Sequence, residues 1–463
     1  MLTVERLSAV DRAWLLMDRP TNPLTIVALV ILASPIDRTA LRELIVERFL
    51  PFERFRCYPV SDSLGASWIP AVHFDVDAHV LAAALPRRAG QAQLEGLVGE
   101  LASTPLNPSR PLWSFHLVEH YQGGSAIIVR IHHCYADGMA LVQVLLSLAN
   151  ESGTASPLPE SEHNLSNGGG LLDTALHNGR QLLSQGSGLL EKGLHYALHP
   201  IEASTVARDA LGVAYEMAHL GTMADDPPTR LKRPLSGIRR VSWAAPLLLE
   251  EVKAIGHVLG CTINDVLIAT LAGAMGRYLE ARGDSTSGLT IRAAVPVNLR
   301  SAETGDEGKL GNRFGLVFVD LPIGIRHPLE RLYTVHARMQ TIKASVQATT
   351  TFGLLTAIGY LPAPVESPAI ALFSAKASLV ASNLPGPREP LMLAGAAVSQ
   401  ILFWVPQAGA IGTGVSMLSY NGRVQFGVIA DGEMIPDPRE LIGNVGTEFE
   451  RLVLLVLLGG AAL

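Results

Sequence analysis

Two adjacent histidines, His132 and His133, constrain this sequence more than any other feature. They follow an apolar run at 125–131, whose β-branched residues predict a strand, and they precede an Asp-Gly turn at Asp137 and Gly138. Successive side chains of a strand point to opposite faces, so only one of the two histidines can face a given cavity. Histidine exchanges a proton near neutral pH, and Asp137 can hold the turn through a charge-assisted hydrogen bond. The pattern therefore favours a proton-transfer site at the end of a strand.

Three other interpretations of the two histidines compete with proton transfer. A buried histidine is more often a core residue with satisfied hydrogen bonds than a functional one. A zinc site needs several converging ligands, whereas adjacent histidines diverge on a strand and Cys134 converges with neither, so we expect no metal site. A serine hydrolase would need a Gly-x-Ser-x-Gly elbow, and the sequence has none.

Composition narrows the class of protein. The 463 residues are enough for two or three domains of about 150 residues each. The net charge of −6 gives no reason to expect a nucleic-acid partner. Three scattered cysteines, Cys57, Cys134 and Cys261, argue against a disulfide framework and fit a reducing compartment. The first residues lack a basic segment followed by an apolar core, so we expect no secretory signal and a cytoplasmic location.

The sequence is unusually apolar, with 48% hydrophobic and 17% charged residues. No run reaches the roughly 18 apolar residues of a membrane-spanning helix, and residues 452–463 come nearest. A well-packed core with a final amphipathic helix would explain this composition. An apolar tunnel and a surface that touches a membrane or a lipid inclusion would explain it equally well.

Residues 1–150 alternate strand and helix patterns and form the predicted N-terminal domain. We expect strands at 24–32, 113–120 and 126–132 and helices at 38–49 and 92–101. Residues 151–170 are rich in Ser, Gly, Asn and Pro, which predicts an exposed linker. A helix-like stretch and a Pro-Pro break follow, so 151–235 is expected to be a linker and helical crossover.

Residues 236–463 repeat the α/β pattern and form the predicted C-terminal domain. Thr262 can cap a helix at 263–280, with Asp265 three positions later as in a capping box. Asn421-Gly422 between two apolar runs predicts a tight hairpin. The other expected elements are a helix at 248–259 and strands at 290–296, 316–321, 378–382, 398–405, 414–420 and 424–430.

The HHxxxDG pattern at 132–138, together with further segments, resembles the bacterial wax ester synthase/acyl-CoA:diacylglycerol acyltransferase family within the CoA-dependent acyltransferase superfamily. HHxxxDG alone indicates only the superfamily. The resemblance runs in order over nearly the whole chain, and its departures, Asn107, Pro108 and Asn298, are mild. The further matching segments lie at 6–14, 105–113, 264–269, 295–300, 311–312, 382–387 and 419–431.

The resemblance implies an α/β fold: two chloramphenicol-acetyltransferase-like sandwiches, with the active site in a channel between them. It also implies direct transfer of a long-chain acyl group from acyl-CoA to diacylglycerol or a long-chain alcohol, giving triacylglycerol or wax ester. Acyl-CoA is then a co-substrate, and no permanently bound cofactor is expected. A peripheral place on the inner membrane or on lipid inclusions is a further implication.

The resemblance assigns the general base to His133, which would take the proton of the attacking alcohol. His132 is expected to be structural because the strand turns it to the opposite face. Asp137 is expected to brace the histidine turn, with Arg300 as its candidate partner. Gly138 is expected to allow a backbone angle or a close approach that a Cβ would block.

The oxyanion of the tetrahedral intermediate needs a hydrogen-bond donor. Asn264, near a helix start, is the candidate donor, although local capping explains it equally well, and Asp265 is expected to be structural. The segment Ser382-Asn383-Leu384-Pro385-Gly386 is expected to line the substrate channel as a rigid loop, and an ordinary turn is the alternative.

Two other functions remain open. An acyltransferase of the same fold could take its acyl group from a carrier protein, although the sequence has no appended carrier-like segment. A non-catalytic lipid-binding or droplet protein is the other alternative. The intact histidine motif argues against it, because a binding protein has no need of a base at a strand end.

Overall fold

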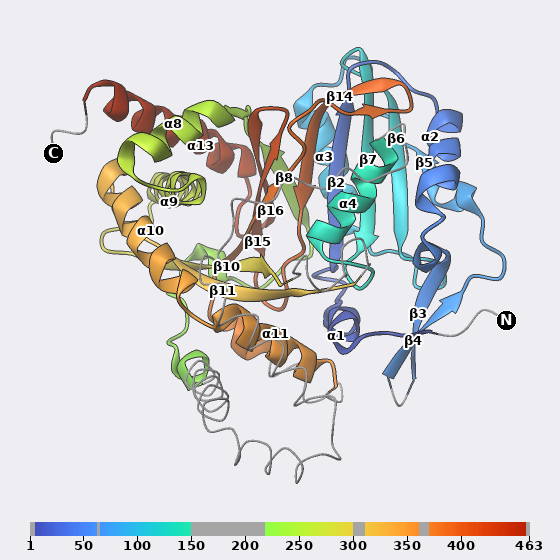
Figure 1. The fold of residues 1–463 in the computed structure, drawn as a ribbon, viewed down its shortest axis with the longest axis horizontal. Helices are drawn as coiled ribbons and strands as arrows, with labels where there is room; N and C mark the ends of the chain where they lie inside the picture. Colours follow the sequence, from blue (N-terminus) through green and yellow to red (C-terminus); the bar gives the residue numbers. More distant parts are fainter. Residues whose placement is uncertain (1–4, 63–64, 150–217, 300–310, 361–369, 460–463) are drawn as a thin grey trace, which may run out of the picture.

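The computed structural model describes residues 5–62, 65–149, 218–299, 311–360 and 370–459. Within these residues, two α/β layers lie side by side, one built mainly from each half of the chain (Figure 1). Most of the predicted linker and crossover, residues 151–217, and Arg300 lie outside the described residues.

A mixed sheet in the order β13-β14-β2-β7-β6-β5 forms the first layer. Every residue of β2 and β7 is buried, which fits the continuous apolar run of β2 after Thr25 and the apolar middle of β7. Its strands are β2 (Thr25–Leu32), β5 (Val80–Ala82), β6 (Trp113–Tyr121), β7 (Gly124–His132), β13 (Met392–Leu393) and β14 (Ala396–Trp404). The helices are α1 (Ala9–Met17), α2 (Arg38–Leu44) with a π-helical turn (Ile45–Phe49), α3 (Gln91–Ser103) and α4 (Gly138–Ala149). A small sheet of β1 (Glu5–Arg6), β4 (Gly65–Pro70) and β3 (Cys57–Asp62) lies beside them.

The second layer is a sheet in the order β11-β10-β12-β15-β16-β8, with β9 paired to β16. Asn421 and Gly422 both have positive φ, at 46° and 72°, and make the predicted tight hairpin between β15 and β16. Its strands are β8 (Arg239–Trp243), β9 (Leu247–Leu248), β10 (Ile291–Asn298), β11 (Phe314–Leu321), β12 (Leu379–Pro385), β15 (Thr413–Tyr420) and β16 (Arg423–Asp431). The helices are α8 (Leu249–Leu259), α9 (Ile263–Ala281), α10 (Pro328–Lys343), α11 (Gln347–Ile358) and α13 (Pro438–Leu457).

Strand β14 belongs to the first sheet although it comes from the second half of the chain. It pairs antiparallel with β2, with Phe403 opposite Ala28 and Trp404 opposite Val27. The Ser416 hydroxyl of β15 donates to the carbonyl of Phe403, so β14 also contacts the second sheet. The predicted C-terminal segment therefore contributes to both sheets, and the boundary between the layers does not follow the chain.

Helix α3 packs against strands of both sheets. Its buried residues Leu94 and Val98 pack in one cluster with Val241 and Trp243 of β8 and with residues of β2. At Gly99 a Cβ would lie 2.8 Å from the carbonyl oxygen of Arg239, so glycine allows the helix to approach β8 closely. The two layers therefore share an apolar core.

No single helix within the described residues is long and apolar enough to cross a membrane. Helices α8 and α9 pass that test only as a pair, and the pair is bent by 102°.

A buried charge cluster supports the helices of the second layer. Glu448 of α13 accepts from Arg331 of α10, from Arg277 of α9 and, at 2.8 Å, from Arg451. Arg331 is 2% exposed and also donates to the carbonyl oxygens of Ala269 and Ile325. Because its charge is removed from water, the loss of the Glu448 carboxylate would leave Arg331 uncompensated.

We predict that Glu448→Ala destabilises the protein by about 3–5 kcal/mol, the usual cost of leaving a buried charge without its partner. Urea unfolding followed by circular dichroism measures the loss. Glu450→Ala, an exposed position on the same helix, is the matched control and should change stability by less than about 0.5 kcal/mol. Equal unfolding midpoints for the two variants would contradict the prediction.

Candidate active site

The two histidines diverge where β7 ends. The backbone N–H of His132 donates to the carbonyl of Leu112 at 2.9 Å, and that of His133 donates to Leu24 at 2.9 Å. Both side chains are buried, but only His133 lines the large cavity. His132 Nδ1 accepts from the N–H of Cys134, which leaves the ring proton on Nε2, 3.8 Å from Asp18. The structure therefore places His132 in a structural position and His133 at the cavity.

His133 lies between two aromatic rings. Its imidazole stacks on Trp14 of α1 with ring centroids 4.1 Å apart, and Phe314 of β11 lies 5.7 Å away. Its Nδ1 is buried and has no hydrogen-bond partner among the described residues. Burial lowers the pKa of His133 to about 4, although the negative charge of Asp137 opposes that shift. The imidazole is therefore neutral and able to accept a proton at neutral pH.

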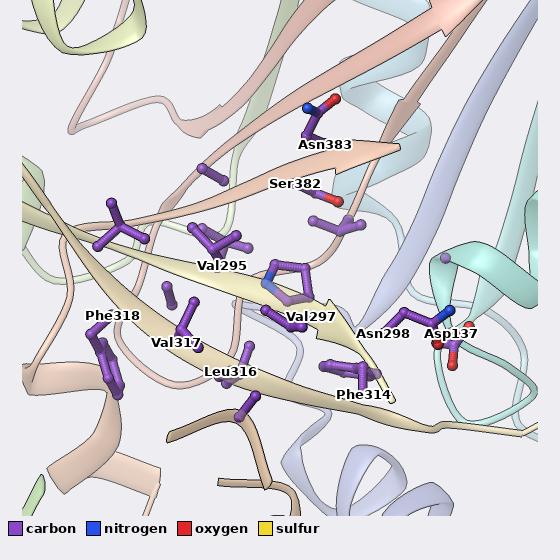
Figure 2. Close-up of a pocket in the computed structure, with 18 of the residues that line it drawn as sticks. Asp137, Val295, Val297, Asn298, Phe314, Leu316, Val317, Phe318, Ser382 and Asn383 are labelled. Atoms are coloured by element: carbon purple, nitrogen blue, oxygen red, sulfur yellow. The ribbon is translucent and has the colours of Figure 1, made fainter. Parts of the chain in front are cut away.

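Asp137 fixes the turn between β7 and α4. One carboxylate oxygen accepts from the N–H of Ala140 at 3.0 Å, and the other accepts from the N–H of Arg313 at 2.9 Å. Asp137 thus caps its own helix and holds the start of β11 through backbone N–H groups. Its candidate partner Arg300 lies outside the described residues. Asp137 also lies on the cavity wall (Figure 2).

The structure overturns the predicted reason for glycine at position 138. A Cβ there would lie 3.5 Å from Leu384 and 3.9 Å from Val405, which is ordinary van der Waals contact. Gly138 is not among the positive-φ residues, because it begins α4. Neither a special backbone angle nor a close approach requires glycine at this position, although Gly138 does line the cavity.

Asn312 connects the histidine turn to the second layer. Its side-chain N–H groups donate to the carbonyl of His133 and to the carboxylate of Asp11, both at 2.8 Å. The Asn312 backbone N–H also donates to Asp11, at 3.1 Å. Burial raises the pKa of Asp11, while Asn312 and Arg54 oppose the rise. This buried network holds His133 against the start of β11.

A cavity of about 570 Å³ is lined by His133 and by residues of the second layer, several of which are labelled in Figure 2. Its wall is mainly apolar, and Figure 2 shows Val295, Leu316 and Phe318 along β10 and β11. Of the described residues on the wall, Asp137 and Lys343 carry a formal charge, and Lys343 ends α10. The arrangement provides a proton acceptor on the wall of a mainly apolar cavity.

Two asparagines face each other on the cavity wall. The Asn383 amide donates to the Asn264 carbonyl oxygen at 2.5 Å, which links β12 to the first turn of α9. Thr262 and Asp265 make the predicted capping box, so capping of α9 is the work of Thr262 and Asp265 rather than of Asn264.

Ser382 and Pro385 also line the cavity, whereas Gly386 is not among its lining residues. A Cβ on Gly386 would lie 2.3 Å from the carbonyl oxygen of Ser419, so glycine is needed there for packing. The predicted rigid loop begins inside β12, because residues 379–385 are a strand.

Four residues around the histidine turn were not among the predicted site residues: Asp11, Trp14, Asn312 and Phe314. All four lie in or directly beside segments that carry the family resemblance, which was the available signal. The contacts of these residues join distant positions, 301 apart for Asn312 and Asp11 and 179 apart for Asn312 and His133, and no local pattern reveals such contacts.

Two family models match the chain. The wax ester synthase/diacylglycerol acyltransferase catalytic domain matches residues 7–267, and the WS/DGAT C-terminal domain matches residues 310–453. A probable diacylglycerol O-acyltransferase of Mycobacterium tuberculosis is 31% identical over 456 residues, with 94% of this chain and 92% of that protein covered. A putative diacylglycerol O-acyltransferase of Mycobacterium bovis is 29% identical, with coverages of 96% and 90%.

Solved structures share the fold. The wax ester synthase/diacylglycerol acyltransferase from Marinobacter aquaeolei superposes with a TM-score of 0.66 at 19% identity, covering 97% of this chain and 99% of that chain. The first condensation domain of the calcium-dependent antibiotic synthetase gives a TM-score of 0.59 at 15% identity, with coverages of 98% and 96%. The predicted α/β fold of two chloramphenicol-acetyltransferase-like sandwiches is thereby confirmed.

We predict that Trp14→Ala raises the pKa of His133 from about 4 toward its ordinary value near 6.5, because water then reaches the imidazolium form. NMR titration of histidine-labelled protein, with His133→Gln to assign the signal, measures the shift. Trp243→Ala removes a buried tryptophan from a different hydrophobic cluster than that of Trp14 and should leave this pKa unchanged. A His133 that titrates near 6.5 in the unaltered protein would show that burial does not control its charge.

Proposed function

The chain belongs to the wax ester synthase/diacylglycerol acyltransferase family, and we propose that it transfers a long-chain acyl group from acyl-CoA to diacylglycerol, a long-chain alcohol, or both. The products would be triacylglycerol or wax ester. The observation that carries the proposal is a neutral, buried His133 on the wall of a mainly apolar cavity of about 570 Å³. A cavity of this size and polarity is suited to an acyl chain, since each buried methylene contributes about 0.8 kcal/mol.

His133 is the proposed general base. As the alcohol oxygen attacks the thioester carbonyl carbon, its proton passes to the imidazole, and the new C–O bond forms. The C–S bond then breaks, and the CoA thiolate leaves with the proton that His133 returns. The low pKa of His133 makes it a weak base, so proton transfer must accompany attack, when the hydroxyl proton becomes acidic. No cofactor takes part.

Asn264 is the proposed donor to the oxyanion. Its carbonyl oxygen accepts from Asn383, which directs the amide group of Asn264. Both residues line the same cavity as His133, so a thioester carbonyl could lie between base and donor. Removing one such donor typically costs about 3–4 kcal/mol of transition-state stabilisation. Asp137 and His132 serve as positioning residues for the histidine turn in this scheme.

Lys343 supports acyl-CoA as the donor. It lies half-buried on the cavity wall, at the end of α10. Its ammonium group can pair with a CoA phosphate while the acyl chain occupies the apolar interior.

Contact with a lipid surface is the remaining part of the proposal. Leu454, Leu457 and Leu458 are 55%, 75% and 82% exposed at the end of α13, and Val258 of α8 is 55% exposed. Exposed leucines at one helix end are suited to shallow insertion among lipid tails.

The alternative acyl donor is an acylated carrier protein. The fold that this chain shares with a condensation domain supports this alternative. The two donors differ in the group that must be recognised at the cavity mouth: a nucleotide in acyl-CoA, and a protein surface in an acylated carrier. The two donors can therefore be distinguished by comparing the KM for acyl-CoA with the KM for a truncated thioester that lacks the nucleotide.

We predict that His133→Ala lowers alcohol-dependent thiol release from palmitoyl-CoA about 10²- to 10⁴-fold, the usual contribution of a general base. Hexadecanol and a diacylglycerol serve as separate acceptors, and their rates rank wax ester against triacylglycerol synthesis. His120→Ala, an exposed histidine of β6, is the control and should keep full activity. Full activity in His133→Ala would refute the assigned base. No release by the unaltered protein with either acceptor would favour a carrier-protein donor or a non-catalytic lipid binder.

We predict that Lys343→Ala raises the KM for palmitoyl-CoA by about 1.5- to 5-fold with little change in kcat, as expected for one partly exposed ion pair. With a palmitoyl N-acetylcysteamine thioester, which lacks the nucleotide, the variant and the unaltered protein should have equal KM values. Lys253→Ala, on α8, is the matched control. An equal rise in KM for both donors would mean that Lys343 shapes the cavity and binds no phosphate.

A further inference from the structure

Three potential metal ligands converge behind the cavity, at the start of α9. Cys261 lies in the short connection between α8 and α9, Asp265 lies in the first turn of α9, and His336 lies on α10. One ligand atom from each residue, the thiol sulfur, a carboxylate oxygen and a ring nitrogen, lies within 4.8 Å of the other two. No local sequence pattern indicates this cluster, because His336 is 71 positions beyond Asp265.

The carboxylate of Asp265 is incompletely satisfied. Its Oδ2 accepts from the N–H of Thr262 at 2.8 Å and faces His336 Nδ1 at 2.7 Å. Its Oδ1 is buried and has no hydrogen-bond partner among the described residues, and the residue is 1% exposed. A buried carboxylate oxygen without a partner is costly, and a cation would offset that cost. The orphaned oxygen is thus independent evidence for a ligand at this point.

We propose that Cys261, Asp265 and His336 bind a divalent transition-metal ion, with zinc as the ion that best fits the three donors. Sulfur, imidazole nitrogen and carboxylate oxygen are the ligands that zinc takes in proteins. Cys261 and His336 are both partly exposed, which leaves an entry path and room for water as the fourth ligand. Zinc bonds of 2.0–2.3 Å imply ligand atoms about 3.5 Å apart, so small side-chain rotations would close the cluster around the ion.

A catalytic cysteine is the rival interpretation of the same cluster, and its chemistry fits poorly. A nucleophilic cysteine needs a thiolate stabilised by positive surroundings. Burial, together with the neighbouring Asp265, raises the pKa of Cys261 to about 11 in the metal-free protein, which is opposite to the shift of an activated nucleophile, whereas a bound cation would favour the thiolate. His336 Nδ1 is directed at Asp265. The cluster lacks a means of activating Cys261 as a nucleophile.

The ion would connect two walls of the cavity. Asp265 directly follows Asn264, whose side chain lines the cavity, and His336 lies on α10 ahead of the lining residues Met339 and Lys343. An ion held by both helices would fix the first turn of α9 relative to α10. The site is therefore structural, and it can be tested without measuring activity.

The test uses full-length protein without a polyhistidine tag, stripped with chelator and titrated with Co²⁺. We expect one equivalent to bind and to give the near-ultraviolet thiolate-to-cobalt charge-transfer band, which Zn²⁺ then abolishes by displacement. Elemental analysis after dialysis against Zn²⁺ should give one zinc per chain, and zinc should raise the melting temperature. Absence of the band, or no stoichiometric metal, overturns the proposal.

Two variants locate the ion. Cys261→Ala should lose the charge-transfer band and the zinc-dependent rise in melting temperature. Cys57→Ala, another partly exposed free cysteine, should keep both. If Cys261→Ala fails to fold, His336→Gln, at a position 28% exposed, should lose stoichiometric binding while its circular dichroism spectrum stays unchanged. Retention of the band in Cys261→Ala, or of stoichiometric binding in His336→Gln, overturns the assignment.

Discussion

The buried hydrogen-bond network between the histidine turn and the start of β11 is the constraint on which the site depends. Asn312 donates to Asp11 and to the carbonyl of His133, while Asp137 accepts from the backbone of Arg313. Each bond contributes only about 1 kcal/mol net, but leaving any one buried group unpaired costs about 1–3 kcal/mol. The two layers must therefore meet in one register, and that register places His133 at the cavity.

The packing of the two layers around His133 also determines the charge of the proposed base. Stacking against Trp14 and burial beside Phe314 remove water from the imidazole, which lowers the pKa of His133 to about 4 and keeps it neutral. A more exposed histidine would be a stronger base but would be partly protonated near pH 6.5. Asp137 opposes the shift, so it favours the imidazolium that forms during proton transfer. Burial keeps His133 unprotonated at neutral pH, and the nearby carboxylate of Asp137 restores part of its basicity.

Local patterns predicted the elements well because their causes are local. Strand β7, the Asn421-Gly422 hairpin and the Thr262–Asp265 capping box all follow from residues within a few positions. The place of β14 in the first sheet was not predictable, since the choice of a partner strand depends on packing between distant segments.

The features of the site likewise fall into those with local causes and those with distant causes. The divergence of His132 and His133 follows from strand geometry, whereas the stacking of Trp14 and the lack of any steric need for glycine at Gly138 depend on the folded chain.

Helix geometry explains why the adjacent Asn264 and Asp265 can do different work. Successive residues of an α-helix are rotated by about 100°, so the two side chains leave α9 in different directions. Asn264 faces the cavity and accepts from Asn383, while Asp265 caps the helix and faces His336 of α10. Because the backbone between them is fixed by the capping box, a displacement of Asp265 would also displace Asn264. The position of the proposed oxyanion donor is therefore set by contacts of residues that do not line the cavity.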